Sequence, residues 1–319
     1  MTVLHLLLIS FILACTSTAF AEALNSHSSN NNMKRVVVTG ANKGIGKACC
    51  QKLLEEHSDV FVWLGSRSSE RGEEAVQDII KSVGGDCQDR IAMVTLDVSS
   101  EESVLQAAAK IQQQLKGDGK LYGIINNAGI IRGPDHSVVD TNYFGTKRVV
   151  NAFLPLLQRP GGRIVNVASA SGPYFVQGLS QRDTLYKALK EPWTIEGGLD
   201  GVDELAKKYC DQYGSSYAFS KALVNAYNLL LARSQPDLIV NAVTPGWIKT
   251  DMTVGQGATN PPSQGAVPPV WALMDPELES TTTGLYYGSD CKRSPIHEYR
   301  SPGDPVYNGP TGIEATSSK

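Results

Sequence analysis

Short, almost continuously apolar segments alternate with longer amphipathic segments from residue 34 onward, and this alternation constrains the fold more than any other feature. Such apolar segments are expected of parallel strands that are covered on both faces. Repeated strand–helix units predict an α/β fold: a doubly wound parallel sheet of the Rossmann type with right-handed crossovers. The expected strands are residues 35–39, 60–66, 91–97, 123–126, 163–168, 238–243 and 284–287, and the expected helices are residues 45–57, 70–83, 101–115, 142–157 and 215–233.

Residues 34–289 are expected to form one domain, because a chain of this length without internal repeats suits a single large domain. Residues 290–319 are rich in Pro, Gly and Ser, which predicts a disordered tail. Residues 22–33 contain a run of Ser and Asn and are interpreted as a disordered linker.

Residues 1–21 are apolar and end in Ala19-Phe20-Ala21, the small-x-small pattern of a signal peptide cleavage site. The charged n-region of a signal peptide is missing, and the length is also compatible with an uncleaved membrane anchor. The segment is similar as well to the presequences of algae with complex plastids. Entry into the secretory pathway is the leading interpretation.

The overall composition excludes several classes of protein and narrows the compartment. The net charge of −3 gives no reason to expect binding to nucleic acid, and the five scattered histidines, without a Cys-x-x-Cys pair, do not predict a zinc site. Beyond Cys15 an odd number of cysteines remains, and no Asn-x-Ser/Thr sequon occurs. An organelle lumen such as the ER therefore fits better than secretion to the outside.

A glycine-rich turn directly follows the first expected strand and precedes the first expected helix. Glycines at this place let the chain turn tightly and bring backbone N–H groups and the helix N-terminus to a pyrophosphate. No Gly-Lys-Ser/Thr closes the turn, so it is not a Walker loop. The expected dinucleotide contacts in this turn are Gly40, Asn42, Lys43, Gly44, Ile45 and Gly46.

The choice of dinucleotide depends on the end of the second strand, about twenty residues further on. An acidic residue there would hold a ribose 2′-hydroxyl, but this chain has Ser66-Arg67. Arg67, Lys43 and Arg71 are cations suited to a 2′-phosphate, which favours NADP(H) over NAD(H). The alternative is that they are ordinary surface charges, above all Arg71.

Asp97 and Val98 end the third strand and are expected beside the adenine, although Asp97 is equally compatible with a role as a strand-end cap.

Tyr217 and Lys221 stand four residues apart and therefore share one face of an expected helix. Ser169 lies at the end of the fifth strand, where the carboxyl ends of strands in an open α/β sheet form the ligand crevice. An ammonium near a phenol favours the phenolate and moves its pKa toward the range useful for proton transfer. These residues predict a catalytic site.

The motifs together resemble the short-chain dehydrogenase/reductase family over residues 34–288. They are Gly40-x-x-x-Gly44-x-Gly46, Asn126-Asn127-Ala128-Gly129, Asn142, Ser169, Tyr217-x-x-x-Lys221 and Pro245-Gly246. Within the family, the sequences around Gly44, around Asn142 and over residues 245–252 are similar to the monomeric, NADPH-dependent carbonyl reductases.

The resemblance implies a role for each of these residues in reducing a small-molecule carbonyl. Tyr217 is the expected general acid, Lys221 would bind the nicotinamide ribose and lower the Tyr217 pKa, and Ser169 would stabilise charge on the carbonyl. Asn142 would hold a water that links Lys221 to solvent. The expected cofactor contacts further include Asn127, Ala128, Gly129, Pro245, Gly246, Trp247 and Thr250.

Tyr217 follows Ser169 by 48 positions, so an insert of about residues 170–214 separates them. It resembles the insert of the monomeric carbonyl reductases, which covers the face that other members use to associate, and it predicts a monomer with helices near residues 179–189 and 202–212. Four aromatic residues are candidates for the wall of an apolar pocket or, alternatively, for a small core: Tyr174, Phe175, Trp193 and Trp247.

Only twelve residues lie between Gly129 and Asn142, fewer than expected in the carbonyl reductases. The start of the helix that bears Asn142 is therefore expected to be lost, which would leave the pocket more open or the activity reduced. The leading hypothesis is an NADPH-dependent reductase of a ketone, aldehyde or quinone. The alternative is a catalytically quiet NADP(H)-binding sensor or scaffold.

Overall fold

The computed structural model describes residues 33–313 except 116–118, 135 and 215, and its main compact unit begins at Arg35. The predictions for residues 1–32 and 314–319 lie outside the described residues. In the described part of the chain, no helix has both the length and the apolar character needed to cross a membrane.

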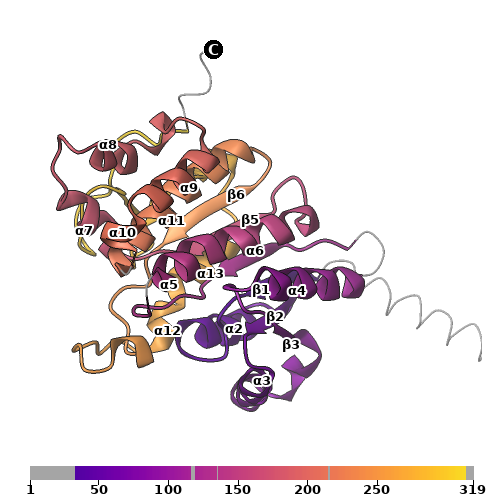
Figure 1. Ribbon diagram of the computed structural model, residues 1–319. Helices are drawn as coiled ribbons and strands as arrows, with labels where there is room; N and C mark the ends of the chain where they lie inside the picture. The colour runs from indigo at the N-terminus through magenta and orange to yellow at the C-terminus, as the bar shows by residue number, and fades with distance from the viewer. Residues whose placement is uncertain (1–32, 116–118, 135, 215, 314–319) are drawn as a thin grey trace, which may run out of the picture. The chain divides into compact units, whose positions relative to one another are not determined.

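The predicted doubly wound sheet is present (Figure 1). Its strand order is β3-β2-β1-β4-β5-β6-β7-β8; β2 with β3, β1 with β4, β4 with β5, β5 with β6 and β6 with β7 are parallel pairs, and β7 with β8 is antiparallel. The order reverses between β1 and β4, where Val36 lies opposite Gly123. The strands are β1 (Lys34–Val38), β2 (Val60–Ser66), β3 (Ile91–Thr95), β4 (Gly123–Asn126), β5 (Arg163–Val167), β6 (Ile239–Val243), β7 (Tyr286–Tyr287) and β8 (Arg293–Ser294).

Helices cover both faces of the sheet. Successive side chains of a strand point to opposite faces, so each buried strand contributes to a core on either side. Val37 packs in the core with helices α4, α6 and α11, whereas Val36 and Val38 pack in a second core with helices α2, α3 and α13. This explains why the strands are apolar at almost every position. The helices named here are α2 (Gly44–Glu56), α3 (Ser69–Val83), α4 (Glu101–Gln114), α6 (Gly145–Phe153), α11 (Tyr217–Ser234) and α13 (Val267–Met274).

The helix that bears Asn142 differs from the prediction at its start. It begins with α5 (Ser137–Val139), before the expected first residue, and passes through a π-helical turn, η2 (Asp140–Phe144), into α6. Asn142 and Tyr143 are both buried within the π turn. The expected loss of the helix start is therefore not observed, since the shorter connection still leads into helical residues, Ser137–Val139, ahead of the π turn.

The insert folds into helices on the same side of the sheet as α6 and α11. Its elements are α7 (Ser171–Gln177), α8 (Thr184–Lys190), η4 (Pro192–Thr194), α9 (Leu199–Lys208) and α10 (Cys210–Tyr213). Asp203 on α9 accepts hydrogen bonds from the Tyr143 hydroxyl at 2.6 Å and from Lys147 Nζ at 2.5 Å. These contacts fasten α9 to the helix that bears Asn142.

The prediction of a disordered tail is wrong for residues 290–313. Strand β8 pairs antiparallel with β7, and Ile313 packs against the core that contains α11. Arg233 Nη1 donates to the Gly312 carbonyl, and Arg293 Nη2 donates to the Gly309 carbonyl. Composition misled here because the stabilising contacts are made by single side chains to backbone carbonyls, which leave no periodic pattern in the sequence.

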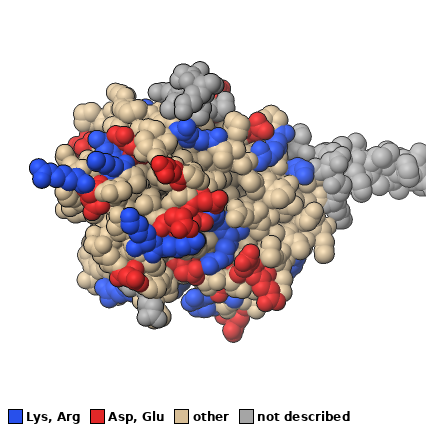
Figure 2. All heavy atoms as spheres, turned by 45° about the horizontal axis from the view of Figure 1, so that its top comes forward, with Lys and Arg blue, Asp and Glu red and all other residues tan. Residues whose placement is uncertain are grey.

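Surface charges of both signs are interspersed on the face shown in Figure 2. Ion pairs between side chains of the described residues include Lys47 with Asp78 at 2.8 Å. The mixture fits the small net charge of −3.

We predict that Asp203→Ala lowers the free energy of unfolding by about 1–3 kcal/mol, because the buried Tyr143 hydroxyl loses its acceptor. Urea denaturation measures the loss. The matched control is Glu204→Ala on the same helix, which removes only the exposed ion pair with Lys207. Equal losses in the two variants would contradict the role given to Asp203.

Candidate active site

The carboxyl ends of the central strands surround a cavity of about 750 Å³. Its lining includes Ser169 after β5 and Tyr217 at the start of α11, together with Pro245 and Gly246 after β6. In an open α/β sheet, ligands bind at this edge and near the reversal of strand order. The structure therefore brings the predicted catalytic and cofactor-contacting segments to one place.

The glycine-rich turn has no room for side chains at two of its glycines. A Cβ atom on Gly46 would lie 2.5 Å from Asn127 Nδ2 and 2.6 Å from the Gly40 carbonyl oxygen. A Cβ atom on Gly40 would lie 2.8 Å from Ala128 Cα, and Gly40 has a φ of +62°. The turn thus keeps its backbone close to the segment after β4, as a cradle for a pyrophosphate requires.

Thr39 joins this turn to the segment Asn127-Ala128. Its Oγ1 accepts hydrogen bonds from the backbone N–H groups of Asn127 and Ala128, both at 3.0 Å. In return, Asn127 Nδ2 donates to the carbonyl oxygens of Thr39 at 2.9 Å and Gly40 at 3.2 Å. The side chain of Asn127 therefore binds the backbone of the glycine-rich turn.

Ser169, Tyr217 and Lys221 converge as predicted. Ser169 and Tyr217 both line the cavity, Ser169 acts to lower the pKa of the Tyr217 phenol, and Lys221 Nζ lies 5.6 Å from the centre of the Tyr217 ring. Helix α11 sets the spacing of Tyr217 and Lys221, and its N-cap Ser216 accepts a hydrogen bond from the Phe219 N–H at 3.2 Å. Lys221 is buried, and its ammonium donates to the Val167 carbonyl at 2.7 Å.

The titration of this pair differs in part from the prediction. Burial is the largest influence on Tyr217 and raises its pKa, while the hydrogen bond with Ser169 acts in the opposite direction. Burial lowers the pKa of Lys221 to about 8, so its ammonium is still mostly charged at neutral pH. The expected lowering of the Tyr217 pKa is thus wrong for the protein alone, where desolvation outweighs the lowering by Ser169.

Asn142 reaches the site through contacts that the sequence did not reveal. Its Oδ1 accepts from the Ile130 N–H at 2.8 Å, and its Nδ2 donates to the Ile130 carbonyl and to Ser220 Oγ, both at 2.9 Å. Ser220 in turn donates to the Tyr217 carbonyl at 2.7 Å. A Cβ atom on Gly129 would lie 3.0 Å from Asn142 Oδ1 and 3.7 Å from Lys221 Nζ. Asn142 therefore lies beside the catalytic helix; the water it was expected to hold stays a prediction.

The predicted phosphate-binding cations differ in their surroundings. Lys43 Nζ forms an ion pair with Asp251 at 2.7 Å, both being exposed. Arg67 and Arg71 are exposed at the end of β2 and in the first turn of α3. No acidic side chain ends β2, as the sequence showed. Asp97 caps a turn, since its Oδ1 accepts from Ser99 N at 3.0 Å, and Val98 is buried in the core beside Gly145.

The segment after β6 contributes the remaining predicted contacts. Pro245, Gly246, Trp247 and Thr250 all line the cavity, as does Ile45 from the start of α2. A Cβ atom on Gly44 would lie 3.4 Å from Thr250 Cγ2, so this segment lies next to the glycine-rich turn.

Of the four aromatic residues considered for the pocket wall, only Trp247 lines the cavity. Phe175 packs against Tyr213 and Phe219, as the alternative of a small core predicts, and Trp193 lies against Gly312. Tyr174 is exposed, and its ring centre lies 6.4 Å from that of Tyr299.

Comparison with known proteins supports the interpretation of this site. The family model described as short chain dehydrogenase matches residues 34–188. Short-chain dehydrogenase/reductase 1 of Saponaria officinalis is 34% identical over 292 residues, which cover 79% of this chain and 92% of the relative. The chain belongs to the short-chain dehydrogenase/reductase family. It is therefore an oxidoreductase.

Two further relatives lie among the reductases of the family. NADPH carbonyl reductase 1 of Mus musculus is 33% identical over 267 residues, covering 76% of this chain and 92% of the relative. The structure of salutaridine reductase from Papaver somniferum has a TM-score of 0.68 at 26% identity, covering 80% of this chain and 99% of that chain. Both likenesses extend over almost the whole of these reductases.

One side of the cavity of this short-chain dehydrogenase/reductase was not predicted from the sequence. Gly288, Ser289, Tyr299, Arg300 and Pro302 line it, and the last three of these come from the segment 290–319 that was predicted to be disordered. Their only sequence signal was the short expected strand that precedes them. Ser220 was missed as well, because a serine inside the Tyr-x-x-x-Lys spacing carries no distinctive pattern.

Proposed function

We propose that this protein reduces the carbonyl group of a small, uncharged ketone, aldehyde or quinone to an alcohol, with NADPH as the reductant. The observation that carries the proposal is the placement of Ser169 and Tyr217 in the cavity lining, with Lys221 Nζ 5.6 Å from the centre of the Tyr217 ring. The carbonyl reductase among the relatives supports the same chemistry.

Each of the three side chains has a part in the reduction. The Tyr217 phenol gives its proton to the carbonyl oxygen as negative charge develops there, and its raised pKa keeps it protonated and ready to donate. The Ser169 hydroxyl donates a hydrogen bond to the same oxygen. The Lys221 ammonium stabilises the phenolate that remains, and its hydrogen bond to the Val167 carbonyl fixes its position.

The cofactor cleft suits NADPH. When bound, NADPH supplies the hydride that the carbonyl carbon receives. The crowded turn at Gly40 and Gly46 would hold the pyrophosphate, and Arg67 and Arg71 would hold the 2′-phosphate, with no carboxylate at the end of β2 to repel it. Lys43 would join them only by giving up its ion pair with Asp251.

An uncharged substrate is favoured by the lining of the cavity. Among the described residues that line it, Arg300 is the only one with a charged side chain, and Asp290 offsets that charge at 2.6 Å. A substrate carboxylate or phosphate would have no free cation to replace its lost hydration. Apolar side chains such as Ile131, Trp247 and Met252 contribute much of the remaining surface.

We also propose that the protein is a monomer and that it enters the secretory pathway to act in an organelle lumen. The packing of α9 against Tyr143 and Lys147 supports the first point, since it covers part of the helix that bears Asn142. The apolar segment from Leu4 to Ala21 supports the second. The alternative of a catalytically quiet sensor has no specific observation in its favour.

We predict that Tyr217→Phe lowers kcat by roughly 10²–10⁴-fold, because the general acid is lost. NADPH binding, measured by fluorescence titration, should be retained. Tyr186→Phe, which removes a phenol from helix α8 of the insert, is the matched control and should keep full activity. Full turnover by Tyr217→Phe would contradict the assigned mechanism.

We predict that Arg67→Ala weakens NADPH binding by roughly ten- to a hundredfold, as expected for lost hydrogen bonds to a charged group. NADH binding should not change, because NADH lacks the 2′-phosphate. Arg182→Ala, which removes an exposed arginine from the insert, serves as the control. An equal effect on the two dinucleotides, or none on either, would show that Arg67 does not select the cofactor.

A further inference from the structure

The segment from Gly288 to Pro302 forms one side of the active-site cavity. The residues that line it are Gly288, Ser289, Ser294, Tyr299, Arg300 and Pro302, called the C-terminal wall below. This wall faces the same cavity as Ser169 and Tyr217, although more than seventy residues separate it from Tyr217 in the sequence. The substrate must therefore fit against a segment that includes the edge strand β8 and the loop after it and that lies outside the insert.

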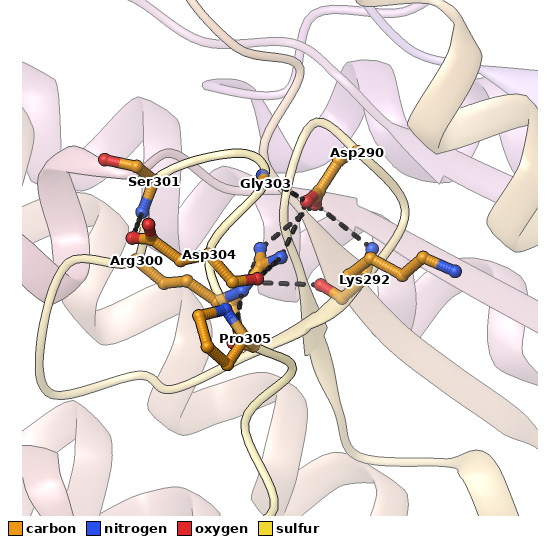
Figure 3. A network of polar contacts seen from close by, with 8 residues as sticks. Asp290, Lys292, Arg300, Ser301, Gly303, Asp304 and Pro305 are labelled. Carbon is orange, nitrogen blue, oxygen red and sulfur yellow. Dashed lines mark hydrogen bonds and ion pairs between the residues drawn. The ribbon is translucent and has the colours of Figure 1, made fainter.

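One arginine holds the C-terminal wall together (Figure 3). Arg300 Nη1 donates to Asp290 Oδ1 at 3.0 Å and to Ser294 Oγ at 3.2 Å. Its Nη2 donates to Asp290 Oδ2 at 2.6 Å and to the Asp304 carbonyl at 2.9 Å, and its Nε donates to the Pro305 carbonyl at 3.0 Å. All five N–H groups of the guanidinium are thus bound to residues between Asp290 and Pro305, and none is left for a substrate.

Asp290 is the carboxylate that binds the Arg300 guanidinium. Besides the two bonds from Arg300, its carboxylate accepts from Lys292 N at 3.2 Å and from Gly303 N at 3.2 Å. The side chains are little exposed, 6% for Arg300 and 21% for Asp290. These contacts hold the pKa of Asp290 down at about 2, so the pair is charged at any physiological pH. A partly buried, bidentate pair of this kind is geometrically specific.

The wall is also joined to the catalytic parts of the cavity. The Tyr299 N–H donates to Gln177 Oε1 at 3.2 Å, and the Tyr299 ring packs edge-on against the ring of Tyr174. Gln177 and Tyr174 both belong to α7, the helix that follows Ser169. On the other side, a Cβ atom on Gly246 would lie 3.1 Å from Ser289 Cβ. A shift of the wall would therefore change the width of the cavity between α7 and the segment after β6.

We propose that Arg300 is a positioning residue for the substrate: its clamp on Asp290 fixes Tyr299 and Pro302, and so sets the size of carbonyl compound that the cavity accepts. This inference rests on the proposed function. Because the guanidinium is fully used and its charge is offset, Arg300 acts through the shape of the wall rather than by contact with a charged substrate.

The test compares two neutral substrates of different size, a diaryl ketone and a short aldehyde, with the full chain and NADPH. Arg300→Met should raise KM for the ketone by about tenfold, an amount typical of a misplaced positioning group, and change KM for the aldehyde much less. The kcat for the aldehyde and the affinity for NADPH should stay near those of the unaltered protein. Tyr299→Ala should shift the same ratio of KM values.

The matched control is Arg90→Met. Arg90 also donates from its guanidinium to backbone carbonyls, those of Leu54 and His57, but it lies outside the cavity lining. It should lower stability without changing the ratio of the two KM values. Equal ratios in Arg300→Met and Arg90→Met would overturn the proposal.

Asp290→Asn keeps the volume of the side chain and one acceptor, and it serves if Arg300→Met does not fold. It should shift the KM ratio in the same direction by a smaller factor, and an unchanged ratio would overturn the proposal.

Calorimetric titration of benzophenone into the protein loaded with NADP⁺ needs no turnover, so it separates the two proposals. Weaker benzophenone binding in Arg300→Met supports the clamp even if no carbonyl is reduced, in which case the proposed function alone fails. Unchanged benzophenone binding counts against the clamp.

Discussion

The hydrogen bonds between Thr39 and the segment Asn127-Ala128 are the constraint on which the site depends. They join the ends of β1 and β4 at the point where the strand order reverses. The glycine-rich turn can approach this junction only because Gly40 and Gly46 lack side chains. A dinucleotide cleft at this edge follows from that closeness, and the segments after β5 and β6 then complete the cavity around it.

The chemistry at the cavity depends on a balance between burial and hydrogen bonding. Burial lowers the pKa of Lys221 to about 8 and raises the pKa of Tyr217 above its usual value of 10, so the two pKa values move apart. Near neutral pH, Tyr217 then holds a proton to give and Lys221 still carries charge to stabilise the phenolate. Asn142 and Ser220 add a chain of hydrogen bonds to the Tyr217 carbonyl, which fixes the first turn of α11.

Much of the fold and of the central site could be predicted from the sequence. Most buried positions of the strands are apolar, and the glycine-rich turn and the Tyr-x-x-x-Lys pair stand where a strand–turn–helix unit and a helix face are expected. The π turn at Asn142 was not predictable, because it depends on how α5 meets α6 and not on a residue pattern.

The C-terminal wall was missed for a different reason. Its order comes from one ion pair, Asp290 with Arg300, and from bonds to backbone carbonyls, rather than from periodic apolar residues. The Pro- and Gly-rich composition of the segment is compatible with disorder and with an irregular ordered wall alike. The ion pair of Lys43 could not be predicted from the sequence either, since its partner Asp251 lies more than two hundred residues away along the chain.

The most direct test of the central claim is the oxidation of NADPH and of NADH, followed at 340 nm, by the full chain. The panel consists of neutral quinones, aldehydes and ketones, each paired with an analogue that bears a carboxylate. We predict turnover that prefers NADPH and that favours the neutral member of each pair. Tight NADPH binding without turnover of any member, or a preference for the carboxylates, would contradict the account.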